Sequence, residues 1–440
     1  MYKAGFSCLF FPPNSGQKGL PIKLSKDATM LRPVLERLED SRDELLRLQT
    51  DLVAIPALGP TNAGQGEKDK AEYLAEYAAR FAGVSVQTIM APDDRVECGY
   101  RPSLVITRPG KSSRTLWLIA HTDVVPTGDL SLWQSDPFVL RQEGDLIYGR
   151  GVEDNHQGMV SALLLLRALE NAGARTDLSL GILLAADEET GNALGIEYIM
   201  EHHPEVFAPD DLIVIPDFGT PTGDAIEVAE KSVLWLRFTV RGKQCHASTP
   251  EAGINSLVAA STLILALDRL HTLFDESDPL FDPPVSTFAP TKMEANVPNV
   301  NTIPGQDVFH LDCRVLPSYA LEEIEGATRE ICDEVEARHG VSITFTPVVR
   351  EQAAPATPSD CEAATRLQAA LRQARGLEAR MIGIGGGTVA ASFRKRGLPA
   401  VCWSTLMHTA HQPNEHASIS ATIADACVFA HLLFEGKTAE

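Results

Sequence analysis

Histidines and acidic residues directly follow several short apolar segments of this 440-residue chain. The segments and the polar residues after them are 115–120 with His121 and Asp123, 178–186 with Glu188 and Glu189, 212–216 with Asp217, and 399–405 with His408 and His411. Short apolar runs of this kind are typical of buried parallel strands. Because ligands bind outside the carboxyl ends of such strands, we expect these side chains to converge at one edge of a sheet.

A metal centre is the simplest chemistry for such a set. Two imidazoles with several carboxylates suit zinc and, less specifically, manganese or cobalt. Six or more acidic groups at one edge would repel one another unless cations neutralised them. A single histidine at a strand end is more often a hydrogen-bonded surface group, and a single acidic run is usually solvated. The same feature after four separate strands favours a shared metal site over these structural interpretations.

The segments around this set predict an α/β fold. Apolar strands at 103–107 and 115–120 precede a helix at 157–172 that is rich in leucine and alanine, and the strand at 178–186 follows it. Strands that alternate with helices indicate a layered sheet, here a mixed, mostly parallel one flanked by helices.

The part from 225 to 350 has a different pattern. Predicted strands at 233–241, 308–316 and 341–349 are interleaved with helices at 254–270 and 321–339, as in a small α+β module inserted into the first domain. The predicted organisation is an extension without stable structure at 1–30, a catalytic domain at 31–224 and 351–440, and the inserted domain at 225–350.

Composition narrows the class of partners and the compartment. The 38 Lys and Arg against 59 Asp and Glu give a formal net charge of -21, which repels nucleic acid and anionic membranes. The eight cysteines are scattered without a CxxC pair, which favours reduced thiols and the cytoplasm. No apolar run approaches the ~18 residues of a membrane span, and residues 1–30 lack a cleavage site typical of a signal peptide.

Five stretches together resemble the motifs of a known enzyme superfamily. They are HTDVVP at 121–126, YGRGVED at 148–154, DEETG at 187–191, GKQCHASTP at 242–250 and HQPNE at 411–415. The chain resembles, from about residue 31 to its end, the dinuclear zinc metallopeptidases and deacylases: aminoacylases, acetylornithine deacetylases, succinyl-diaminopimelate desuccinylases and carnosinase-type dipeptidases. The resemblance implies a zinc-exopeptidase-like catalytic domain with an inserted α+β sandwich that serves as lid and dimerisation domain.

The resemblance also implies a set of metal ligands. His121 and Asp217 would hold one Zn²⁺, Glu189 and His411 would hold the other, and Asp154 would bridge the two, with Co²⁺ or Mn²⁺ as substitutes. By the same resemblance, a cis peptide is expected at 154–155.

The resemblance further implies catalytic roles. Asp123 would hydrogen-bond the imidazole of His121 and fix its tautomer. Glu188 would be the general base that takes a proton from a zinc-bridging water and passes it to the leaving amine. His246 would stabilise the oxyanion, in relatives often from the partner subunit, although an exposed strand-end histidine is the structural alternative.

Substrate recognition is implied for four residues of the lid and of a Gly-rich loop, namely Asn301, Arg314, Gly387 and Thr388. Arg314 could clamp a substrate carboxylate, but a surface ion pair with Asp312 fits the sequence nearly as well. Arg394 is a second candidate for anion binding.

The predicted function is metal-dependent hydrolysis of an amide bond in a small molecule, a dipeptide or an N-acyl amino acid, by a homodimer that contacts its partner through the inserted domain. Asp at 217 resembles the peptidases, whereas 383–393 and 408–415 resemble the deacylases and desuccinylases, so both classes stay open. His156 stands where many relatives have lysine. The competing hypotheses are a non-catalytic binding protein on the same scaffold and a single-metal enzyme of unrelated fold.

Overall fold

The computed structural model describes residues 28–434, which divide into two compact units. The first comprises the chain up to Ile226 together with Pro358–Arg380 and the chain from Leu398 onwards, and the second comprises Glu227–Thr357 and Met381–Gly397. The predicted extension at 1–30 lies outside the described residues except for 28–30, which begin the first helix.

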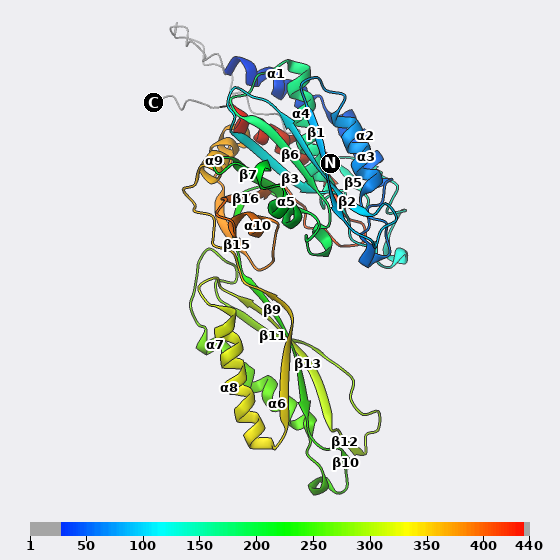
Figure 1. Cartoon of the computed structure of the whole chain (residues 1–440), viewed down its shortest axis with the longest axis vertical. Coiled ribbons are helices and arrows are strands. Elements are labelled where there is room, and N and C mark those ends of the chain that lie inside the picture. Colours follow the sequence, from blue (N-terminus) through cyan, green and yellow to red (C-terminus); the bar gives the residue numbers. More distant parts are fainter. Residues whose placement is uncertain (1–27, 435–440) are drawn as a thin grey trace, which may run out of the picture. The chain divides into compact units, whose positions relative to one another are not determined.

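The first unit is built on a mixed, mostly parallel sheet, which confirms the predicted fold class (Figure 1). Its strands run in the order β1 (Ser85–Pro92), β2 (Tyr100–Arg108), β6 (Ser179–Ala185), β3 (Thr115–His121), β7 (Leu212–Gly219) and β16 (Ala400–Ser404). Strands β6, β3, β7 and β16 pair in parallel, whereas β2 pairs antiparallel with both of its neighbours, β1 and β6. The parallel strands are buried along almost their whole length, as continuous apolar runs require. In the sheet order β8 (Ala225–Glu230) and β15 (Arg380–Ile384) follow, and each carries the chain from the first unit into the second.

Helices flank this sheet (Figure 1). They are α1 (Ala28–Glu39), α2 (Arg42–Val53), α3 (Lys68–Ala78), α4 (His156–Ala172), α5 (Ile196–His202), α9 (Glu362–Arg375) and α11 (Ile419–Leu433). Helix α4 is buried on nearly all sides, which explains its continuous Leu and Ala content. It ends at Gly173, whose positive φ of 56° suits a residue without a side chain.

The first unit also contains a small three-stranded antiparallel sheet. Its order is β17 (His416–Ser418), β5 (Leu146–Tyr148) and β4 (Arg141–Glu143), and His416 pairs with Tyr148. This pairing brings the segment after His411 next to the segment before Asp154, although more than two hundred and fifty residues separate them along the chain.

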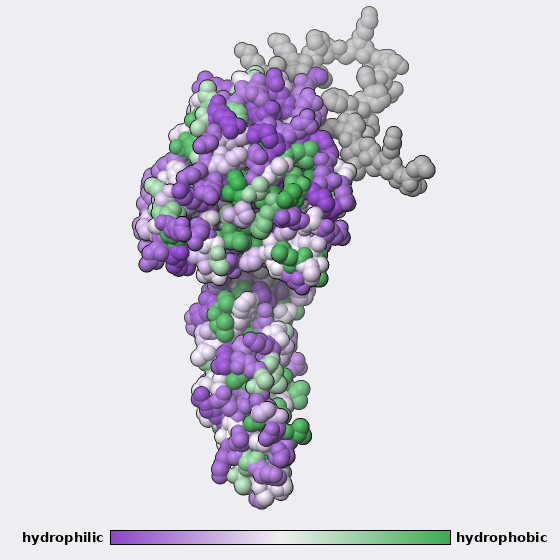
Figure 2. All heavy atoms as spheres, turned by 90° about the vertical axis from the view of Figure 1, so that its right-hand side faces the viewer, coloured by the Kyte–Doolittle hydropathy of each residue, from purple (hydrophilic) through white to green (hydrophobic). Residues whose placement is uncertain are grey.

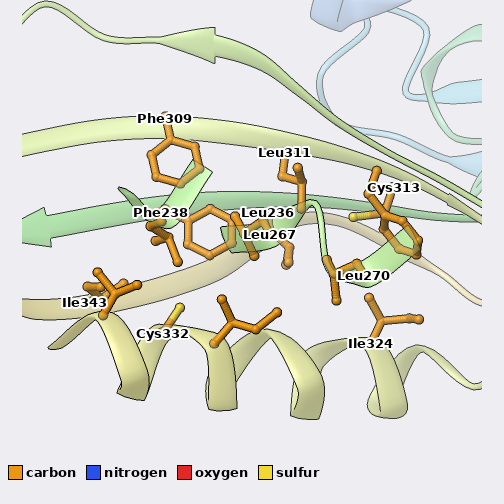
Figure 3. Packing of buried hydrophobic residues seen from close by; sticks show 14 of the residues in the cluster. Leu236, Phe238, Leu267, Leu270, Phe309, Leu311, Cys313, Ile324, Cys332 and Ile343 are labelled. Atoms are coloured by element: carbon orange, nitrogen blue, oxygen red, sulfur yellow. The ribbon is translucent and has the colours of Figure 1, made fainter. Parts of the chain in front are cut away.

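The second unit is an antiparallel sheet with helices packed against it. The strand order is β11 (Thr287–Met293), β13 (Gln306–Val315), β9 (Ser232–Arg241) and β14 (Ser342–Glu351), and the helices are α6 (Ser256–Leu267), α7 (Leu270–Leu273) and α8 (Leu321–His339). Every second residue of β9 and β13 contributes to one buried core, where Phe238 stacks on Phe309 at 4.7 Å between ring centroids (Figure 3). Leu267 and Ile324 enter this core from the helices. The predicted α+β module is therefore present as a separate packing unit.

The borders of the two units differ slightly from the prediction. Met381–Gly397 groups with the second unit, whereas the sequence assigned it to the catalytic domain. Backbone hydrogen bonds give the reason, because Gly383 N donates to Leu280 O at 2.6 Å. The ends of the main insert also meet, since Thr357 N donates to Val228 O at 2.8 Å. The short helix α10 (Ala390–Arg394) belongs to the same segment.

One helical segment of the described chain, Ser256–Leu273, is long and apolar enough by length and composition to cross a membrane, which the sequence prediction did not identify. A core helix passes the same test, and here Leu263, Leu267 and Leu270 pack into the core of the second unit. Leu257, Val258 and Leu265 of the same segment are exposed. Figure 2 shows hydrophobic residues interspersed with hydrophilic ones on the face of the molecule that it displays.

Candidate metal centre

The ends of three parallel strands bring the predicted ligands together in the first unit. His121 is the last residue of β3, Asp217 lies near the end of β7, and Glu189 follows β6 within a 3-10 turn at Glu188–Thr190. Asp154 comes from the loop before α4, and His411 from the loop after β16. These five residues form two overlapping groups of three in which all ligand atoms lie within 4.8 Å of one another.

Asp154 is common to both groups. Its Oδ1 lies 2.9 Å from Nε2 of His121, and its Oδ2 lies 3.0 Å from Nε2 of His411. Asp217 Oδ1 completes the first group at 3.7 Å from His121 Nε2, and Glu189 Oε2 completes the second at 3.1 Å from His411 Nε2. Each carboxylate oxygen of Asp154 therefore faces a different imidazole, as expected of a bridging ligand.

The tautomer of His121 is set by the backbone. Its Nδ1 lies 2.9 Å from the carbonyl oxygen of Asp123 and 3.5 Å from the carboxylate Oδ1 of the same residue. Because Nδ1–H donates to this carbonyl, Nε2 keeps its lone pair and faces the carboxylates. The predicted hydrogen bond to His121 thus comes chiefly from the main chain of Asp123.

The carboxylate of Asp123 has a different position from the one predicted. It accepts hydrogen bonds from Glu188 N at 3.1 Å and from Glu189 N at 3.0 Å. Asp123 therefore holds the turn that carries Glu188 and Glu189. The sequence contains no local signal for this contact, because 65 residues separate Asp123 from Glu188.

Asn155 is a further residue that the sequence reasoning missed. Its Nδ2 donates to Pro216 O at 2.9 Å and to the carboxylate of Asp217. The peptide bond between Asp154 and Asn155 is cis, as the resemblance implied. Asn155 thus links the loop of Asp154 to the end of β7.

The titration of these groups indicates a strong local excess of negative charge. Burial, together with the neighbouring carboxylates of Asp154 and Glu189, raises the pKa of Asp217 to about 7 against the opposing effect of His121. Burial also raises the pKa of Glu188 well above its usual value. Hydrogen bonds to Asp154 and Glu189 raise the pKa of His411 to about 10. Divalent ions would relieve this repulsion between the carboxylates, and they would bind both imidazoles in the neutral form. The donor set therefore fits metal ions.

His246 and Asn301 lie together on a two-stranded ribbon of the second unit, formed by β10 (Cys245–His246) and β12 (Thr302–Ile303). Ala247 N donates to Asn301 O at 2.9 Å. His246 is exposed, and its Nδ1 accepts a hydrogen bond from Ser248 N at 3.1 Å. Neutral His246 therefore carries its proton on Nε2 and can donate it to an acceptor.

Arg314, Gly387 and Thr388 lie elsewhere in the second unit. Arg314 makes a two-pronged ion pair with Asp312, at 2.8 and 3.2 Å, and donates to Gly385 O at 2.9 Å. Arg314 is thus next to the Gly-rich loop. It also forms the ion pair with Asp312 that the sequence allowed as the alternative to binding a substrate carboxylate. Thr388 N donates to Glu230 at 2.8 Å, which anchors this loop.

Arg394 does not fit the predicted role of a second anion-binding residue. It is buried, and its two terminal nitrogens each lie 2.8 Å from the carboxylate of Glu227. A guanidinium that is paired in this way inside the second unit is a structural ion pair.

Comparison with known proteins agrees with this geometry. Residues 117–435 match the pattern of Peptidase family M20/M25/M40. An uncharacterized metallohydrolase of Methanococcus maripaludis is 38% identical over 410 residues, covering 89% of this chain and 99% of its own. The succinyl-diaminopimelate desuccinylase of Ehrlichia canis is 25% identical over 388 residues, covering 85% and 93%.

Solved structures show the same fold at lower identity. Human carnosine dipeptidase 1 superposes with a TM-score of 0.70 at 16% identity and covers 92% of this chain and 98% of its own. A tripeptidase of Staphylococcus aureus reaches 0.68 at 18% identity, with coverage of 89% and 97%. The resemblance read from the five motifs is confirmed, and the chain belongs to Peptidase family M20/M25/M40 as a metal-dependent hydrolase that acts on amide bonds.

Proposed function

We propose that the chain hydrolyses the amide bond of a dipeptide or an N-acyl amino acid at a centre of two zinc ions. The observation that carries this proposal is the position of Asp154, whose two oxygens lie 2.9 and 3.0 Å from two different imidazoles. His121 and Asp217 would hold one ion, and Glu189 and His411 the other. Bound divalent ions of this kind polarise a carbonyl group and lower the pKa of water. Cobalt or manganese could substitute for zinc.

Glu188 is the proposed general base. Its main-chain N–H donates to the carboxylate of Asp123, and its own carboxylate interacts electrostatically with His121 and Asp217 without belonging to either ligand group. Its raised pKa suits a group that must take up a proton from water and then give it to the departing amine near neutral pH. Asp123 would act as a positioning residue for both glutamates of the turn.

His246 would donate its Nε2–H to the developing oxyanion, and a second copy of the chain would supply it. The ribbon of His246 lies before Gln306, the first residue of β13, whereas Arg314 lies near the end of the same strand (Figure 1). Gln306 and Arg314 are about eight residues apart along this strand, which corresponds to a separation of roughly 26 Å. One small substrate cannot contact both ends within one second unit, so residues of two copies must contribute if both groups bind it.

The outer side of α6 is the proposed dimer surface. Leu257, Val258 and Leu265 are exposed there by 39%, 50% and 77%. Exposed apolar residues grouped on one helix are typical of a protein contact. A two-fold symmetric pair through the second unit would cover them.

Complementation between two inactive variants tests the shared site. Chains with Glu188→Ala and chains with His246→Ala should each be nearly inactive, and the hybrid dimer of the two should recover roughly half of the wild-type activity, because one of its two sites would contain both residues. Activity should be assayed on the purified hybrid carrying two different tags. No recovery in the hybrid, or a fully active monomer in sedimentation, would contradict a contribution of His246 from the partner subunit.

A substrate panel tests the proposed reaction. N-acetyl and N-succinyl amino acids and free dipeptides should be incubated with the chain in the presence of zinc or cobalt, and the released amine measured. Asp217 favours the dipeptides, as do the dipeptidase and tripeptidase names among the structural neighbours, while the desuccinylase name among the relatives favours N-succinyl compounds. Turnover of none of them would favour a binding protein instead.

The scattered cysteines favour a reducing compartment, the cytoplasm.

A further inference from the structure

Two buried glutamates outside the proposed ligand set connect the loops that carry Asp154 and His411. Glu153 directly precedes Asp154, and Glu415 follows His411 by four residues. Their relative exposures are 1% and 0%. Each stands within a sequence motif of the family, yet neither is a proposed ligand or base.

Glu415 binds the loop of Asp154 with both of its oxygens. Oε2 accepts from Arg150 Nη1 at 2.6 Å and from Gly151 N at 2.9 Å. Oε1 accepts from Glu153 N at 2.9 Å and from Asp154 N at 3.1 Å. The main chain of a proposed bridging ligand is therefore held by a side chain from the loop of His411.

Glu153 makes the reverse connection. One of its oxygens accepts from Met407 N, and the other accepts from Thr409 N and from Thr409 Oγ1, the latter at 2.8 Å. These donors lie just before His411. Each loop thus contributes one carboxylate that accepts from the main-chain amides of the other loop.

We propose that Glu153 and Glu415 form a reciprocal brace, a pair of positioning residues that fixes Asp154 relative to His411 and so sets the affinity of the metal group Asp154–Glu189–His411. Both oxygens of each carboxylate are occupied by donors, so a glutamine would direct its own NH₂ at N–H groups. Buried N–H groups would then lack an acceptor, and the two loops would move apart to restore hydration. The inference rests on the proposed two-metal centre, and it concerns how the chain holds that centre before an ion binds.

Metal titration of Glu153→Gln, Glu415→Gln and the double variant tests the brace. Affinities for zinc are measured by competition with a chelator, and the absorption spectrum of the fully cobalt-loaded protein reports the ligand geometry. We expect one of the two sites to lose about 10–100-fold in affinity in each single variant, as for other residues that orient a ligand. The double variant should lose little more, because both carboxylates hold the same pair of loops.

Glu227→Gln is the matched control. Glu227 is equally buried and is paired with Arg394 in the second unit, so its replacement should lower the melting temperature without changing zinc affinity or the cobalt spectrum. A general loss of stability is thereby separated from a change in the metal site.

The outcomes separate the brace from the proposed function. A wild-type chain that binds fewer than two ions contradicts the two-metal centre itself. Two ions in the wild type, together with unchanged affinity and spectrum in both single variants, overturn the brace alone, and so do additive losses in the double variant. If the glutamine variants do not fold, Thr409→Val removes one donor to Glu153 and should weaken the same site to a smaller extent, whereas an unchanged affinity would overturn the brace.

Discussion

Replacing Glu188 with alanine should lower kcat by about 10²–10⁴-fold, the contribution of a well-placed general acid–base group. The loss follows because the variant lacks the proposed base, while the neighbouring Glu189 of the same turn is one of the proposed ligands. Bound metal should stay at two ions per chain, since Glu188 is not among the proposed ligands. Steady-state kinetics on the best substrate of the panel and metal analysis of the same sample give both quantities.

Two further variants make this result specific. Glu188→Gln keeps the volume of the side chain and removes only its basicity, so it should be nearly as inactive as the alanine variant. Glu201→Ala removes an exposed carboxylate from α5 in the same unit and should leave kcat unchanged. Turnover by Glu188→Ala within about tenfold of the wild type would assign the proton transfer to another group.

Replacing Asp154 with asparagine should remove both metal ions under conditions in which the wild type retains them. An amide offers only one oxygen, and its NH₂ would face one of the two imidazoles that the carboxylate now contacts at 2.9 and 3.0 Å. We expect activity to fall below detection and metal to fall to well under one ion per chain after dialysis. Elemental analysis of the dialysed protein measures this directly.

The unshared ligands provide the comparison. Asp217→Asn and Glu189→Gln each affect one group only, so each should keep about one ion per chain. If Asp154→Asn lost no more metal than these two variants, the carboxylate would not be shared between two ions.

Short-range patterns were sufficient to predict the fold class and the convergence of the residues that follow the strands, whereas Asp154 was implied only by the resemblance to the family. Apolar runs such as those of β3 and β6 identify buried strands, and the residue after each run must lie at the sheet edge wherever the strands are parallel. The second unit was also predictable in outline, since the alternation along β9 matches a sheet that is buried on one face.

Contacts between distant loops could not be predicted in this way. A glutamate such as Glu415 has no local signature that distinguishes an acceptor of buried amides from a solvated surface group, and its partner Gly151 lies 264 residues away along the chain. The same holds for the carboxylate of Asp123. Arg394 was misassigned because charge alone does not reveal that Glu227 already neutralises it.

The contact between the two ends of the main insert has a consequence for assembly of the metal site. His411 must find Asp154 and Glu189 across a very long stretch of chain, and closing such a loop costs entropy that grows with the logarithm of its length. Once the second unit has folded on its own core, Thr357 is hydrogen-bonded to Val228. The roughly 130 residues between them then no longer add to the length of the loop that must close. By that scaling, halving the length of the loop between Asp154 and His411 lowers the entropic cost of closing it by about 0.6 kcal/mol. The insert thus shortens the path by which the distant ligands meet.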